Sequence, residues 1–294
     1  MTVPPGGRRT SRPVSADIDV FGATDTGKSR PSNQDHFLVA SLHKLLRAQQ
    51  TSLAPEELSE LVSETRGYIF LVADGVGSRP EGHRASGTAL RSIAQHVTHF
   101  MDLYRRLDPD RESAFLTELE RSVHRSHSQL RDEGKREYGG EGLATTLTMV
   151  AVLWPRAYLV QVGDSRCYRL RDGELERMSR DQTVAEALVA SGALSPADLA
   201  RSPFRNVLAS AIGGPEAVPE TRVTDCQWND VLLLCTDGLT KHVTDDEIEA
   251  ELRGITSAEA SCRALVDLAL ERGGTDNITV VIGRLRARRM GSGT

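Results

Sequence analysis

The segment Tyr68–Gly77, with the sequence YIFLVADGVG, constrains the fold of this 294-residue chain more than any other. Its first five residues, Tyr68–Val72, are all apolar or aromatic, which predicts a buried strand that ends at Ala73–Asp74. Gly75 follows at once, and a residue without a side chain lets other groups approach the backbone closely. The sequence therefore predicts that the carboxylate of Asp74 is held at the end of a rigid strand.

Three other aspartates have the same kind of surroundings. Asp164 follows an apolar run in LVQVGDSR, and Asp237 follows another in VLLLCTDGL. Asp276 lies on the other side of a turn, just before the predicted strand Ile278–Ile282. A single Asp-Gly pair after a strand is commonly only a turn, so each acid alone also has a structural explanation. Four acids in four such positions together indicate one acidic metal site.

Five short motifs follow one another along the chain, and together they resemble a known family. They are NQD at Asn33–Asp35, ADGVG at Ala73–Gly77, GDSRCYRLRDGEL at Gly163–Leu175, CTDGL at Cys235–Leu239 and DNITVV at Asp276–Val281. In this order they resemble the motifs of the metal-dependent protein serine/threonine phosphatases, the PPM or PP2C-like family, in a compact bacterial form. The resemblance covers roughly residues 18 to 286, which is within the size of one domain.

The resemblance implies an α+β fold. The expected architecture is a β-sandwich of two antiparallel sheets with helices on both sides, in α-β-β-α layers. It also implies two Mn²⁺ or Mg²⁺ ions, bridged by Asp74, with a further ligand from the Gly75 carbonyl and the second ion held by Asp237 and Asp276. A donor set of oxygens without His or Cys agrees, because such hard ligands favour Mg²⁺ or Mn²⁺ over Zn²⁺.

Three more residues receive roles from the resemblance. Asp35 is expected to act mainly through metal-bound waters, and Asp164, together with Asp237, to form a weaker third metal site. Arg30, five residues before Asp35, matches the family arginine that grips the substrate phosphate. A guanidinium suits this role because its planar fork of donors fits phosphate oxygens.

The expected activity is hydrolysis of phosphoserine and phosphothreonine in proteins by direct attack of a metal-bridging hydroxide. Phosphorylated proteins would be the partners, with a serine/threonine kinase or its substrates among them. A non-catalytic phosphoprotein-binding module on the same fold is one alternative, but the chain retains Arg30 and all five acids. A small-molecule phosphatase is a second alternative.

Composition limits other classes of function. The formal net charge of −5 gives no reason to expect nucleic-acid binding. No apolar run approaches the roughly 20 residues of a membrane-spanning helix, and the amino terminus lacks the apolar stretch of a secretory signal. The four cysteines show no CxxC spacing, which predicts buried reduced thiols and a cytoplasmic protein.

The chain divides into a few segments. Residues 1–17 are expected to be a disordered tail, residues 18–286 the phosphatase domain, and residues 287–294 a second tail. Within the domain, residues 41–67 are interpreted as a helical insertion and residues 180–214 as a flap beside the active site. Helices are predicted to begin at two capping boxes, Thr244–Glu247 and Thr256–Glu259. Asp172 and Gly173 predict a type I′ turn.

Overall fold

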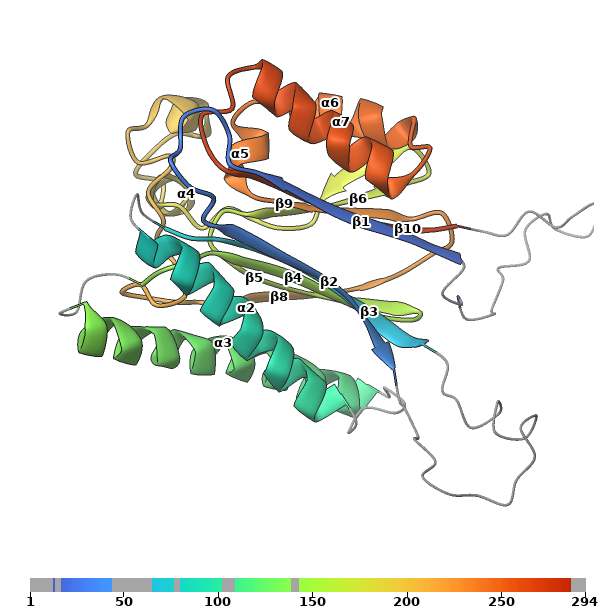
Figure 1. Cartoon of the computed structure of the whole chain (residues 1–294), viewed down its shortest axis with the longest axis horizontal. Helices are drawn as coiled ribbons and strands as arrows, with labels where there is room; N and C mark the ends of the chain where they lie inside the picture. The colour runs from blue at the N-terminus through green and yellow to red at the C-terminus, as the bar shows by residue number, and fades with distance from the viewer. Residues whose placement is uncertain are drawn as a thin grey trace, which may run out of the picture.

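The computed structural model describes residue 13 and residues 17–43, 65–76, 80–101, 109–138 and 143–286. These residues form two five-stranded antiparallel sheets that face each other (Figure 1). The first sheet has the order β1-β10-β9-β6-β7, with β1 Ile18–Asp25, β6 Arg166–Arg171, β7 Glu174–Arg177, β9 Val231–Cys235 and β10 Ile278–Leu285. The second has the order β2-β3-β4-β5-β8, with β2 Asp35–His43, β3 Thr65–Asp74, β4 Leu147–Leu153, β5 Arg156–Val162 and β8 Glu220–Asp225.

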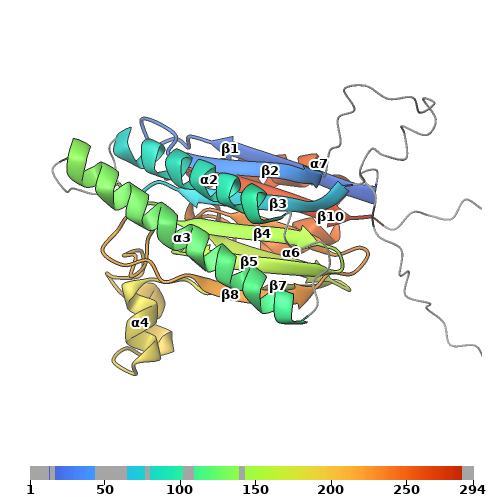
Figure 2. The same ribbon diagram turned by 90° about the horizontal axis from the view of Figure 1, so that it is seen from below.

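Helices cover the outer faces of both sheets (Figure 1). The long helices α2, Pro80–Met101, and α3, Pro109–Glu137, lie along the second sheet. The helices α6, Asp245–Arg253, and α7, Ala258–Glu271, lie along the first sheet, next to the short helix α5, Asp237–Thr240. Helix α4, Val184–Ala190, and the 3-10 helix η2, Pro196–Arg201, belong to a segment that projects beyond one edge of the sandwich (Figure 2). The expected α-β-β-α layering is confirmed.

Strand β3 shows why the apolar run at its centre is uninterrupted. Ile69 and Leu71 pack against α2 and α3, whereas Tyr68, Phe70 and Val72 pack against the first sheet. Successive side chains of a strand point to opposite faces, and here both faces are covered. The centre of β3 therefore carries no polar alternation.

Several local predictions can be compared with the structure. Asp172 and Gly173 have φ of 53° and 83°, as a type I′ turn requires, and Thr244 and Glu247 form the expected capping box. The predicted capping box at Thr256 is wrong, because α7 is capped by Ser257, whose hydroxyl accepts from the Ala260 N–H. All four cysteines are buried and unbridged, as expected.

The predicted insertion at residues 41–67 is too wide at both ends. β2 continues to His43 and β3 begins at Thr65, with Leu42 paired to Gly67. Residues 44–64, where a helix was expected, lie outside the described part of the chain. So do residues 1–12 and 14–16 of the expected tail 1–17, and the expected tail 287–294.

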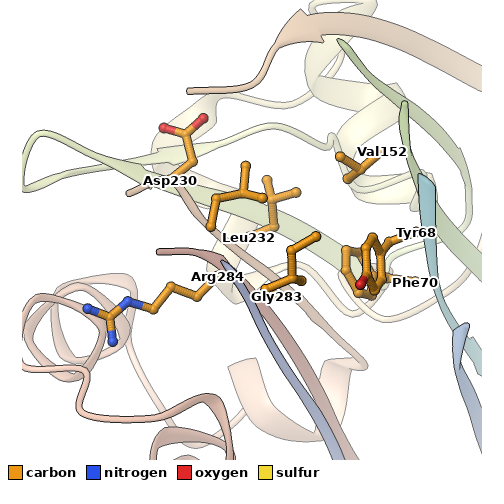
Figure 3. A pocket seen from close by; sticks show the side chains of 9 residues that line it. Tyr68, Phe70, Val152, Asp230, Leu232, Gly283 and Arg284 are labelled. Carbon is orange, nitrogen blue, oxygen red and sulfur yellow. The ribbon is translucent and has the colours of Figure 1, made fainter. Parts of the chain in front are cut away.

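The two ends of the sandwich differ in chemistry. Asp74 and Asp35 lie at one end of the β2–β3 pair, where β10 and α5 also begin. The opposite end holds a small apolar hollow between the sheets, lined by side chains that include Tyr68, Phe70 and Val152 (Figure 3). None of the five expected ligand acids lines it. Among the described helices, none combines the length and apolar character that crossing a membrane requires.

Candidate metal centre

Asp35 and Asp74 lie side by side in an acidic cluster. β2 begins with Asp35 and β3 ends with Asp74, and the two residues are paired across the strands. The Oδ2 atom of Asp35 accepts hydrogen bonds from the hydroxyls of Thr236, at 2.8 Å, and Thr279, at 2.7 Å. Its Oδ1 atom is buried and has no hydrogen-bond partner among the described residues. An unpaired buried carboxylate oxygen is costly unless a cation or another donor reaches it.

Burial dominates the electrostatics of these two acids. It raises the pKa of Asp35 to about 7, against the hydrogen bonds from the two threonines, and the charges of Asp237 and Asp276 raise it further. Burial also raises the pKa of Asp74 well above its usual range, with the charge of Asp35 as the next cause. Both shifts have the same physical cause: removal from water and nearby negative charges disfavour the ionised carboxylate, and a nearby cation would favour it.

Asp237 and Asp276 come from the neighbouring sheet. Asp237 opens α5 directly after β9, and Asp276 lies in the turn before β10. Lys241 places its Nζ atom 2.6 Å from Oδ2 of Asp237 and 2.6 Å from Oδ2 of Asp276. The second oxygen of Asp237, Oδ1, is buried and has no hydrogen-bond partner in the described chain.

Arg30 also contacts this pair. Its Nε donates to Oδ1 of Asp276 at 2.7 Å, and its Nη2 donates to Oδ2 of Asp276 at 2.8 Å. Burial acts to raise the pKa of Asp276, but the hydrogen bonds from Arg30 and Lys241 outweigh it and lower that pKa. For Asp237 burial prevails over Lys241, and the pKa is raised.

Asp164 approaches the cluster from the end of β5. The preceding residue, Gly163, has φ of 103°, a conformation that L side chains rarely adopt. Burial raises the pKa of Asp164 to about 7, and the next cause is the charge of Asp237. The segment 180–214 is anchored here, because Gln182 and Gly163 exchange two hydrogen bonds of 2.9 Å.

Gly75 occupies a position with no room for a side chain. A Cβ atom at Gly75 would lie 2.2 Å from the carbonyl oxygen of Gly82, at the start of α2. The Gly75 N–H donates to the carbonyl oxygen of Gln34 at 3.2 Å, which ties this turn to the residue before Asp35. The Asp74–Gly75 backbone is therefore held tightly between β2 and α2.

The donor set of this cluster fits a hard divalent cation. All the expected ligand groups are oxygens, and two of their carboxylate oxygens are buried with no hydrogen-bond partner in the part of the chain that the structure describes. No three acidic, histidine or cysteine side chains of the described residues are already arranged as a coordination shell. Instead, carboxylate oxygens of Asp237 and Asp276 form ion pairs with Lys241, and Asp276 also forms one with Arg30.

Sequence reasoning missed the residues that support the acids. Thr236 and Thr279 lie inside the motifs CTDGL and DNITVV, but nothing local showed that both hydroxyls reach Asp35 across more than 200 residues of sequence. Lys241 had a usable signal, because residues four apart on a helix are neighbours and Lys241 follows Asp237 by four.

Comparisons with known proteins agree with this geometry. A family model described as protein phosphatase 2C matches residues 57–271, a span that contains Asp74, Asp164 and Asp237. The serine/threonine protein phosphatase PstP of Mycobacterium tuberculosis is 34% identical over 73% of this chain, which spans about 40% of the length of PstP. The serine/threonine phosphatase stp of Listeria welshimeri is 30% identical over 73% of this chain and 83% of its own length.

A solved structure extends the similarity to nearly the whole chain. The catalytic domain of the serine/threonine protein phosphatase PstP, in complex with two manganese ions, superposes with a TM-score of 0.68 at 27% identity. The superposition covers 92% of this chain and 99% of that domain. Sequence match, sheet topology and the gathered acids lead to one conclusion: the chain belongs to the protein phosphatase 2C family.

Proposed function

We propose that this protein is a phosphatase that removes phosphate from phosphoserine and phosphothreonine in proteins, with Mn²⁺ or Mg²⁺ as cofactor. The observation that carries the proposal is the cluster of five carboxylates at one end of the sandwich. Among the described residues, one buried oxygen of Asp35 and one of Asp237 have no hydrogen-bond partner. The family relatives named as serine/threonine phosphatases, and the neighbour that holds two manganese ions, support it.

Each acid would have its own role in holding the ions. Asp74, at the centre of the cluster, is proposed to bridge two ions, with the Gly75 carbonyl as a further ligand. Asp237 and Asp276 would hold the second ion, and Asp35 would act through bound water. Asp164, near Asp237, would contribute to a weaker third site. Bound in this way, the ions would lower the pKa of a water nucleophile and neutralise charge on the phosphate.

The chain's own groups would bind and orient the substrate. Arg30 is the more exposed of the two cations that contact the acids, with 38% of its side chain accessible. Its guanidinium forms an ion pair with Asp276. We assign it to the phosphate oxygens, where two N–H donors would also stabilise the charge of the transition state. Thr236 and Thr279 would hold Asp35 in one orientation by donating to the same oxygen.

Hydrolysis of a phosphothreonine peptide by the purified chain tests this proposal. We expect phosphate release with Mn²⁺, weaker or equal release with Mg²⁺, and none in EDTA or in the variant Asp74→Asn. Tight binding of the peptide without hydrolysis would instead identify a non-catalytic binding module. Turnover of a small aryl phosphate with no turnover of any phosphopeptide would identify a small-molecule phosphatase.

A further inference from the structure

Lys241 occupies a position that the expected roles of the acids do not explain. Its ammonium group lies 2.6 Å from Asp237 and 2.6 Å from Asp276, between the two carboxylates proposed to hold one cation. The side chain is only 27% exposed, and those of the two acids are 19% and 14% exposed. Lys241 is therefore a partly buried cation inside the acidic cluster rather than a solvated surface charge.

The backbone around α5 fixes the position of Lys241 relative to both acids. Its N–H donates to the Asp237 carbonyl at 2.9 Å, which places it one helical turn after that acid. A Cβ atom at Gly238 would lie 1.9 Å from the carbonyl oxygen of Asn277, so α5 packs directly on the turn that carries Asp276. This close packing brings a side chain at position 241 to both carboxylates at once.

An ammonium group and a divalent cation make incompatible demands on these oxygens. Mg²⁺ requires oxygen ligands at about 2.0–2.1 Å in near-ideal octahedral geometry. The ammonium nitrogen of Lys241 already occupies the space next to the Oδ2 atoms that the ion would bind. A cation bound to the same oxygens would also be repelled by the positive charge of the ammonium group. Asp276 has a second cationic partner as well, because Arg30 donates hydrogen bonds to both of its carboxylate oxygens.

We propose that the ammonium group of Lys241 competes with one divalent cation for the carboxylates of Asp237 and Asp276. Cation entry would require the ammonium group to leave the pair, so Lys241 sets how much Mn²⁺ or Mg²⁺ is needed to fill this half of the site. In turn, Lys241 neutralises the two acids whenever the cation concentration is too low. This inference rests on the proposed metal site.

Calorimetric titration with Mn²⁺ alone tests the competition without reference to turnover. Lys241→Met, of similar length but without charge, should bind the more weakly held Mn²⁺ about tenfold more tightly than the unmodified chain, the change that 1.4 kcal/mol produces. Lys241→Gln should show the same gain in Mn²⁺ affinity, and it replaces Lys241→Met in the experiment if the methionine variant does not fold. Lys241→Arg retains the charge and should restore weak binding.

Lys28→Met is the matched control. Lys28 lies in the adjoining loop, where its N–H donates to Gly274 at 2.7 Å, and no ion pair joins its side chain to an aspartate among the described residues. This variant removes the same charge and should leave Mn²⁺ affinity unchanged. In EDTA, Lys241→Met should also melt below Lys28→Met, because Asp237 loses its ion-pair partner and Asp276 retains only Arg30.

The outcomes separate the two proposals. Equal Mn²⁺ affinity in Lys241→Met, Lys28→Met and the unmodified chain would overturn the competition, as would weaker binding in Lys241→Met. No Mn²⁺ binding by any variant would overturn both the competition and the metal site. Mn²⁺ binding with the expected differences but without phosphopeptide hydrolysis would overturn only the proposed function.

Discussion

Asp35, the first residue of β2, is the register partner of Asp74, the last residue of β3. Paired residues of antiparallel strands have side chains on the same face, so the pairing alone brings two carboxyl groups together. Asp35 is buried and Asp74 is half-buried, and the charge of Asp35 contributes to the raised pKa of Asp74. This arrangement costs stability unless positive charge is supplied, and its tolerance within the fold agrees with a role in binding cations.

The aspartates should separate by role when they are neutralised. Asp74→Asn removes a charge that two ions are proposed to share, so tight Mn²⁺ binding and nearly all turnover should be lost together. Asp164→Asn should retain the tight pair of ions and hydrolyse phosphopeptides more slowly. Calorimetry with Mn²⁺ and the kcat for a phosphopeptide measure both. If Asp164 is only an acid that caps a turn, its loss will lower the Tm and leave kcat unchanged.

Arg30→Ala should impair the handling of phosphate and leave folding intact. Removing a donor that contacts the charge of the transition state commonly costs about 10²–10³-fold in rate, and we expect a loss at the lower end of this range in kcat/KM. Lys28→Ala removes another cation from the same loop and should have no effect. Unchanged kcat/KM in Arg30→Ala would show that Arg30 serves only as an ion-pair partner of Asp276.

Thr279→Val should disturb Asp35 through the loss of one hydrogen bond. The Thr279 hydroxyl donates to Asp35 Oδ2 at 2.7 Å, and hydrogen bonds to charged groups contribute about 1.5–3 kcal/mol. Without this donor the pKa of Asp35 should rise further, so Mn²⁺ affinity near neutral pH should fall. Thr24→Val is the control, because Thr24 contacts the Thr279 hydroxyl at 2.8 Å and makes no hydrogen bond to Asp35. Equal affinities in both variants would contradict the role of Thr279.

The stability of the metal-stripped protein should fall as pH rises. Burial raises the pKa of Asp35 and of Asp164 from 3.8 to about 7, so in that interval the folded protein holds protons that the unfolded chain has lost. Their contribution to the free energy of unfolding is complete below about pH 4 and is lost as pH rises through about 7. In EDTA, the Tm should be lower at about pH 8 than at about pH 5.5.

Saturating Mn²⁺ provides the contrast for this pH series. The ions require ionised carboxylates, so metal binding releases protons and strengthens with pH. Stabilisation by Mn²⁺, measured as the difference in Tm from the EDTA sample, should therefore grow with pH. A Tm in EDTA that is constant or rises over the same interval would contradict the raised pKa values.

Replacing residues 44–64 with a short turn should leave hydrolysis of a small aryl phosphate nearly unchanged. The cut falls outside the paired residues His43 and Thr65, at the end of the β2–β3 pair opposite Asp35 and Asp74. Asp35 and His43 are eight positions apart along the strand, which is roughly 27 Å at 3.4 Å per residue. Loss of this activity in a protein that still folds would show that the segment shapes the site itself.

The sequence by itself determined the features that depend on neighbouring residues. The apolar run before Asp74 marked a strand buried on both faces, and Asp172-Gly173 marked a turn because both residues must adopt positive φ. The capping box at Thr244 was likewise readable, whereas at Thr256 the same pattern misled by one residue because Ser257 is an equally good cap. Signals of this kind act over a few residues.

Tertiary structure decided what lies next to what. Asp35 meets Thr236 and Thr279 only because strand order brings β2, β9 and β10 to one end of the sandwich, and strand order is not a local property. The position of Lys241 on Asp276 depends on α5 packing against a turn 35 residues further along the chain. Sequence motifs identified the acids, but the cations and hydroxyls that control their charge come together only through long-range packing.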